Sequence, residues 1–137
     1  MLFRSSQLFF LAAADAAPAV QEEELTAQQW FERGLAASDL DEKLRLYSEA
    51  IRLKLDYADA FINRGVARRQ KGDVEGALQD YSEAIRLKPD DADAFYNRGI
   101  ARAAKGDVEG ALQDYDEAIR LKPDYAAAFN KIGRAHV

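Results

Sequence analysis

The chain has 137 residues, a net charge of −5 and no cysteine. Hydrophobic residues make up 48% and charged residues 31% of it, a mixture typical of a folded protein rather than a disordered one. An acidic chain without a basic stripe is a poor candidate for nucleic-acid binding. The lack of cysteine excludes disulfides, thiolate metal sites and a cysteine nucleophile.

The first 19 residues have the three-part layout of a secretory signal peptide. Arg4 precedes an apolar run at residues 8–14, and the Ala-Pro-Ala sequence at 17–19 fits a cleavage site. The run is too short to cross a bilayer as a helix. We therefore expect residues 1–19 to be a signal peptide, the mature chain to be secreted or periplasmic, and no stable membrane insertion after cleavage. The alternative is a disordered or weakly helical leader on a cytoplasmic protein.

A short polar segment at residues 20–26, which contains three consecutive glutamates, reads as a linker. After it the chain repeats itself with a period of 34 residues. Residues 58–91 and 92–125 differ at only six aligned positions. Residues 27–57 form an earlier, diverged copy that is three residues shorter, and residues 126–137 begin a partial fourth.

Each full copy predicts two helices joined by a tight turn. In the second copy the first helix is expected over residues 58–71, where Gly72 can adopt the left-handed conformation that ends a helix. Asp73 is a good N-cap for a second helix over residues 74–87, whose apolar residues recur at spacings of three and four. Pro89 closes the copy because it cannot continue a helix.

This pattern resembles the tetratricopeptide repeat (TPR) family, which places a large residue, Gly, Ala, an aromatic residue, Ala and Pro at fixed offsets. The matching residues are Phe61, Gly65, Ala77, Tyr81, Ala84 and Pro89, then Phe95, Gly99, Ala111, Tyr115, Ala118 and Pro123, and in the first copy Trp30, Gly34, Lys43, Tyr47, Ala50 and Leu55. Arg64 and Arg98 stand where the family usually has Leu. The resemblance implies an all-α fold, a right-handed α-solenoid of about three repeats plus a partial fourth.

The resemblance also implies a concave groove, lined by the first helices of the repeats, that binds a protein or peptide. The groove positions carried over from the family are Phe31, Leu35, Asp59, Ile62, Asn63, Val66, Arg69, Gln70, Asp93, Tyr96, Asn97 and Ile100. Their apolar residues and the amides of Asn63 and Asn97 suit an extended or helical peptide. Helix–helix packing is the alternative role for Phe31, Ile62 and Tyr96.

The two near-identical copies differ mainly at these groove positions. Four of the six differences fall there, as Ile62/Tyr96, Val66/Ile100, Arg69/Ala103 and Gln70/Ala104. This pattern favours a surface adapted to a ligand, and drift at exposed positions is the alternative. A TPR subtype that binds the acidic C-terminal tail of chaperones needs Lys at these positions. None of the three complete copies has one, so binding of such a tail is not predicted.

No catalytic, metal or cofactor site is predicted. The only histidine is His136, so a histidine-based triad and a zinc site are not available. The KGDVEG segments at 71–76 and 105–110 lack the P-loop spacing and fit interhelical turns. The sequence therefore predicts a protein-binding scaffold rather than an enzyme. Alternatives are a docking or regulatory part of a larger, truncated enzyme and a self-associating structural module.

The last six residues, 132–137, match the translation of a common sequencing adapter that ends in a stop codon. We interpret them as adapter-derived, in which case native sequence stops near Asn130 or Lys131 and the gene fragment is truncated. The alternative is a genuine start of a fourth repeat, in whose frame Gly133 and Ala135 fit.

Overall fold

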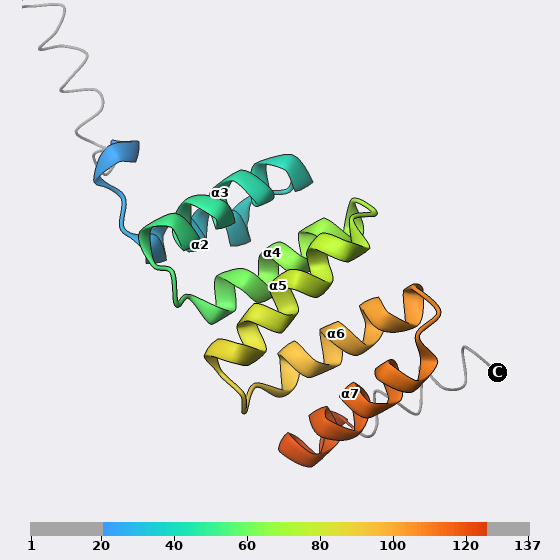
Figure 1. Cartoon of the computed structure of the whole chain (residues 1–137). Coiled ribbons are helices and arrows are strands. Elements are labelled where there is room, and N and C mark those ends of the chain that lie inside the picture. Colours follow the sequence, from blue (N-terminus) through green and yellow to red (C-terminus); the bar gives the residue numbers. More distant parts are fainter. Residues whose placement is uncertain (1–20, 126–137) are drawn as a thin grey trace, which may run out of the picture.

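The computed structural model describes residues 21–125, which form six α-helices and one short 3-10 helix and contain no strand. The elements are η1 (Glu22–Glu24), α2 (Ala27–Ala36), α3 (Leu40–Leu53), α4 (Ala58–Gln70), α5 (Val74–Leu87), α6 (Ala92–Ala104) and α7 (Val108–Leu121). They stack as three helical hairpins, one for each full repeat (Figure 1). The all-α solenoid is confirmed. The predicted signal peptide and partial fourth repeat lie outside the described residues.

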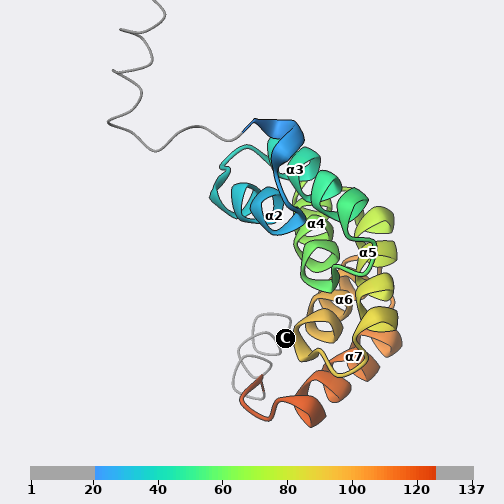
Figure 2. The same ribbon diagram turned by 90° about the vertical axis from the view of Figure 1, so that its left-hand side faces the viewer.

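The three hairpins are arranged along an arc (Figure 2). The first helices of the repeats, α2, α4 and α6, lie on its inner side, and α3, α5 and α7 lie on its outer side. We call the surface formed by α2, α4 and α6 the inner face. Each of α4 and α6 packs against its own hairpin partner and against the second helix of the preceding repeat, which joins the repeats into one continuous array.

The turn within each hairpin has the predicted chemistry. Gly72 has a φ of +91° and Gly106 a φ of +86°, a region in which a Cβ atom would be strained. The Asp73 carboxylate accepts a hydrogen bond from the Gly76 backbone N–H at 2.9 Å and so caps α5. Helix α5 has the predicted bounds, whereas α4 ends one residue early, with Lys71 as its C-cap.

The small and aromatic positions of the repeat meet inside each hairpin. A Cβ atom added to Gly65 would lie 2.5 Å from Cε1 of Tyr81, far inside van der Waals contact. Tyr81 is fully buried, and Gly34 and Gly99 face tyrosines of their own repeats in the same way. Glycine is therefore required at this position because the tyrosine ring lies directly against the backbone of the first helix.

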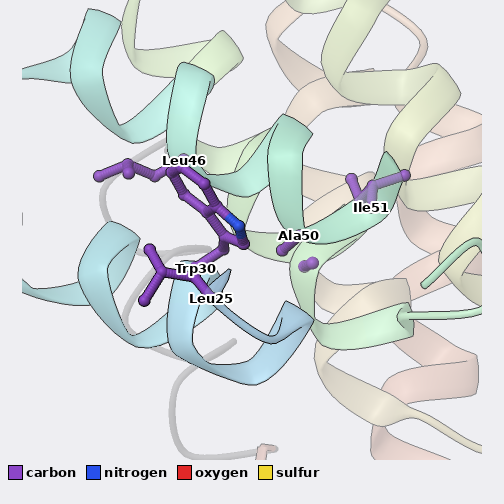
Figure 3. Close-up of a cluster of buried hydrophobic side chains, with 6 residues drawn as sticks. Leu25, Trp30, Leu46, Ala50 and Ile51 are labelled. Atoms are coloured by element: carbon purple, nitrogen blue, oxygen red, sulfur yellow. The ribbon is translucent and has the colours of Figure 1, made fainter. Parts of the chain in front are cut away.

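The segment predicted as a linker contributes to the fold of the first repeat. Thr26 caps α2 by accepting from the Gln29 backbone N–H at 3.1 Å, and the Gln29 side chain accepts from the Thr26 N–H at 2.9 Å. Just before this capping box, Leu25 packs in one cluster with Trp30 and is only 6% exposed (Figure 3). This is a hydrophobic staple, which fixes the direction in which the chain enters α2.

Buried ion pairs explain why arginine replaces the family's usual Leu in the two central repeats. Asp80 of α5 is 3% exposed and accepts hydrogen bonds from Arg64 and Arg68 of α4. Arg64 also donates to the Ser48 hydroxyl of the preceding repeat at 3.2 Å. The third repeat has the same arrangement, with Asp114 buried between two arginines of α6. The carboxylate thus ties two helices of one repeat together.

The first repeat uses a lysine instead. Lys43 stands where the other repeats have a buried Ala, and its ammonium donates to the backbone carbonyl of Gly34 at 2.9 Å. Leu55, which replaces the closing Pro, is 75% exposed. Helix α2 has ten residues where α4 and α6 have thirteen. The predicted variant character of this repeat therefore has a structural basis in a shorter first helix held by a lysine.

Candidate functional site

All twelve predicted groove residues lie on α2, α4 or α6, the helices of the inner side of the arc (Figure 2). Their exposure differs. Leu35 is 53% exposed, and Asp59, Gln70 and Asp93 are also exposed. Ile62 is buried. The others are half-buried: Phe31, Asn63, Val66, Arg69, Tyr96, Asn97 and Ile100. The inner face is therefore a mixed surface of partly exposed apolar and polar side chains.

Ile62 and Val66 pack between repeats. Ile62 is 8% exposed and belongs to the core cluster that also contains Tyr81 and Ala94, and Val66 packs against this cluster. Ile62 consequently offers little surface to a ligand. Ile62 therefore has the alternative role considered from the sequence, which is helix–helix packing.

Phe31 and Tyr96 occupy the same position of the repeat, and each belongs to an aromatic cluster. The Phe31 ring lies 5.8 Å from that of Tyr47 and 5.0 Å from that of Tyr57. We call these three residues the first aromatic cluster. In the same way, the Tyr96 ring lies 6.2 Å from that of Tyr115 and 5.0 Å from that of Tyr125. These three form the second aromatic cluster, two repeats further on.

The middle repeat has no such cluster. Ile62 and Asp91 stand at the positions that are aromatic in the other two repeats, and Tyr81 remains. Asp91 instead caps α6, where its carboxylate accepts from the Asp93 N–H at 3.0 Å. Burial, together with the nearby Asp93 carboxylate, raises the pKa of Asp91 above its usual value. This grouping of aromatic residues was not predicted from the sequence, because Tyr57 and Tyr125 lie outside the inferred groove positions.

Arg69 occupies the inner face of the middle repeat, between the two aromatic clusters. Burial raises the pKa of the Tyr81 hydroxyl, and the adjacent Arg69 guanidinium opposes that rise. The Nε of Arg69 and the Tyr81 hydroxyl oxygen are both buried, and neither has a well-formed hydrogen bond to any residue in 21–125. Ala103 takes this position in the third repeat, where Tyr115 is half-buried rather than fully buried. Arg69 therefore lies next to the buried Tyr81 hydroxyl.

The two asparagines do not form a simple row of free amides. The Asn97 side chain donates to the backbone carbonyl of Asp93 at 2.8 Å, one turn earlier in α6. One amide hydrogen of Asn97 is thus used within its own helix. Asn63 is half-buried at the corresponding position of α4.

Two glutamates of the outer helices form ion pairs within their own helices. Glu83 pairs with Arg86 and Glu117 with Arg120, and in each pair the guanidinium lowers the pKa of the glutamate. The KGDVEG segments form the interhelical turns. Residues 21–125 contain no cluster of three or more potential metal ligands. Within the same range, no helix is long and apolar enough to cross a bilayer.

Comparison with protein families gives a match to the model described as TPR repeat, over residues 65–106 and 101–137, together more than half of the chain. A comparison with curated proteins gives no significant match.

Several solved structures share the fold. An Arabidopsis OM64 TPR domain matches with a TM-score of 0.74 and 26% identity, over 82% of this chain and 97% of the other. The first TPR of Spaghetti (RPAP3), bound to the HSP90 peptide SRMEEVD, matches with a TM-score of 0.72 and 24% identity, over 80% and 92%. MamA matches with a TM-score of 0.67 and 23% identity over 74% of this chain, which spans 61% of the MamA chain.

Proposed function

Because the chain belongs to the tetratricopeptide repeat family, we propose that it is a scaffold that binds a protein or peptide segment on its inner face. The partly exposed side chains there combine apolar anchors, such as Leu35 and Tyr96, with polar groups such as Asn63. A peptide is recognised by the same combination of apolar burial and a few directional hydrogen bonds.

One observation carries this proposal. The second and third repeats are identical at 28 of 34 positions, and four of their six differences lie on α4 and α6 at inner-face positions. The residues that hold each hairpin together, including Gly65, Tyr81 and Asp80, are the same in both. The framework is thus constant, while the inner-face positions change from one repeat to the next.

Two TPR structures similar to this chain were solved with the HSP90 peptide SRMEEVD bound, which supports peptide binding as the type of function. We do not extend that particular ligand to this chain. The predicted inner-face positions hold no lysine, and Asp59 and Asp93 add negative charge there. The proposed ligand is instead a segment with apolar anchors.

The proposal is tested by substituting Tyr96 and Asn97 together with alanine and comparing partner capture with that of the wild type. The matched control is Gln113→Ala, an exposed residue on α7 at the outer side of the arc. Bound proteins are quantified by mass spectrometry after capture from the periplasmic or extracellular and, separately, the cytoplasmic fraction of the native cell. We expect the double variant to lose partners that the control retains. Equal capture by all three folded proteins would refute the inner-face assignment.

Self-association is a second candidate function, favoured by one feature of α7. Val108 and Leu112 are 61% and 55% exposed, whereas the corresponding Val74 and Leu78 of α5 pack against the core. An apolar helix face of this kind is a candidate for contact with a second copy of the chain. Measurement of molar mass in solution over a range of concentrations tests this, and a strict monomer would refute it.

A further inference from the structure

We propose that Arg69 binds an acidic side chain of an extended peptide, whose apolar residues on either side contact the first and second aromatic clusters. This inference rests on the proposed peptide-binding function and specifies the chemistry of its ligand. It commits to an internal Asp or Glu residue rather than a terminal carboxylate. The reason is that partly exposed rings lie one repeat before and one repeat after Arg69, so the ligand chain has to continue in both directions.

Arg69 is distinguished from the other half-buried arginines by its lack of a carboxylate partner. Arg64 and Arg68 pair with Asp80, and the third repeat pairs its two equivalents with Asp114. Arg69 forms no ion pair with any residue in 21–125, and its buried Nε has no well-formed hydrogen bond there. A partly buried guanidinium without a carboxylate is costly, and a ligand carboxylate would supply the missing partner.

Charge on the inner face agrees with this assignment. Among the twelve predicted groove residues, Arg69 carries the only positive charge, while Asp59 and Asp93 are negative. The two aspartates lie in the first turns of α4 and α6, whereas Arg69 lies near the end of α4. An acidic group of a ligand is therefore favoured near Arg69 and disfavoured near the starts of these helices.

The position of Arg69 also suits the path between the aromatic clusters. Side chains on a helix lean toward its N-terminus, and the Arg69 guanidinium reaches back to Tyr81, which packs against Gly65 one turn earlier. This brings its charge from the C-terminal end of α4 back toward the middle of the helix. A peptide that crosses the three helices would pass the guanidinium midway.

Helix spacing sets the expected spacing of the ligand residues. Helices α4 and α6 are in contact, and packed helices lie about 10 Å apart. If α2 and α4 have the same spacing, α2 and α6 are roughly 20 Å apart. An extended peptide advances about 3.3 Å per residue. We therefore expect two apolar anchors about six residues apart, with the acidic residue about three residues from each.

The test is selection of peptides from a library of random linear dodecamers, with both ends fused within a carrier protein. On the wild-type chain we expect enrichment of Asp or Glu midway between two apolar residues. On Arg69→Ala, which copies the Ala103 of the third repeat, the acidic enrichment should disappear while the apolar anchors remain. Arg33→Ala, which removes an exposed arginine of α2 outside the predicted positions, should select the same peptides as the wild type.

Affinities of one selected peptide complete the test. Arg69→Ala should weaken its binding at least about tenfold, as expected for loss of a charged hydrogen bond. Replacing the acidic residue of the peptide by its amide should weaken binding to the wild type similarly and have little further effect on Arg69→Ala. Circular dichroism establishes that each variant is folded.

Three outcomes would overturn the inference. Selected peptides that need Tyr96 and Asn97 but show no acidic preference would refute the role of Arg69 and leave the proposed function intact. Acidic enrichment seen only in a library with free C-termini would show that a terminal carboxylate is bound instead. Failure to select any peptide that depends on Tyr96 and Asn97 would refute the proposed function along with this inference.

Discussion

Arg64 and Asp80 form a bidentate ion pair between α4 and α5, with Nε–Oδ2 and Nη2–Oδ1 distances of 3.0 and 2.8 Å. Arg68 donates to the same carboxylate at 3.0 Å. With three charge-assisted hydrogen bonds, the buried Asp80 carboxylate is well satisfied. An arginine that departs from the family pattern is thus compensated by a buried partner in the same repeat.

Asp80→Ala should destabilise the chain by about 3 kcal/mol, because it leaves two partly buried guanidinium groups without their counterion. The free energy of unfolding is measured by urea denaturation followed by circular dichroism. Glu83→Ala, which removes the carboxylate that pairs with the exposed Arg86, serves as control and should cost less than about 1 kcal/mol. Equal effects of the two substitutions would show that the buried pair contributes no more than a surface pair.

Gly65→Ala should destabilise the second repeat by about 1–3 kcal/mol, since the added methyl group overlaps the fully buried Tyr81 ring. Gly72→Asn is the contrasting substitution, because Asn tolerates the left-handed conformation and no atom lies within 4 Å of the added Cβ. Its cost should be smaller. Thermal denaturation of both variants decides this, and a larger loss for Gly72→Asn would contradict the packing argument.

Leu25→Ala should loosen the first repeat locally, because it removes the staple against Trp30. Repeats contact only their neighbours, so the effect should decline along the array. Amide hydrogen exchange followed by mass spectrometry should show faster exchange in α2 and unchanged exchange in α7. Unchanged exchange in α2 would show that residues 21–26 are the simple linker that the sequence suggested.

Asp91→Asn should stabilise the protein at neutral pH and have little effect in acid. The pKa of Asp91 is raised in the folded chain, so its ionised form is less favourable there than in the unfolded chain. Stability is then lost as the pH rises from the ordinary Asp pKa of about 3.9 through the higher folded value. Asn removes this loss and still caps α6.

The measurement for Asp91 is the free energy of unfolding of both proteins between acid and neutral pH. The gain from the substitution should appear only above the ordinary Asp pKa. NMR titration of the Asp91 carboxyl group provides the independent check, and Asp93→Asn should lower its pKa. A benefit of Asp91→Asn that is the same at every pH would contradict the electrostatic explanation.

The fold could be predicted from the sequence because two near-identical copies of the repeat contain the same helix and turn signals. Gly72 and Asp73 identify the turn, and the apolar spacing identifies both helices of the hairpin. The buried ion pairs of Asp80 could not be predicted in this way, because an acidic residue within an amphipathic helix is expected to be exposed. Its signal is the recurrence of Arg and Asp sixteen residues apart, as Arg64–Asp80 and Arg98–Asp114.

The candidate site was less accessible to sequence reasoning. Ile62 and Tyr96 occupy equivalent positions of their repeats. Repeat position does not tell which of the two side chains is buried between repeats. Ile62 is buried in the core, whereas Tyr96 stacks on Tyr125 and remains partly exposed. Such differences depend on side-chain volume and on neighbours in the adjoining repeat, which the positional pattern of a family does not contain.

Peptide binding on the inner face can be located by NMR titration of the isotope-labelled chain with a peptide selected from the library. We expect the backbone amide shifts to change on α4 and α6, around Asn63, Arg69 and Asn97, and to stay constant on the outer helices. Changes confined to α3, α5 and α7 would contradict binding on the inner face.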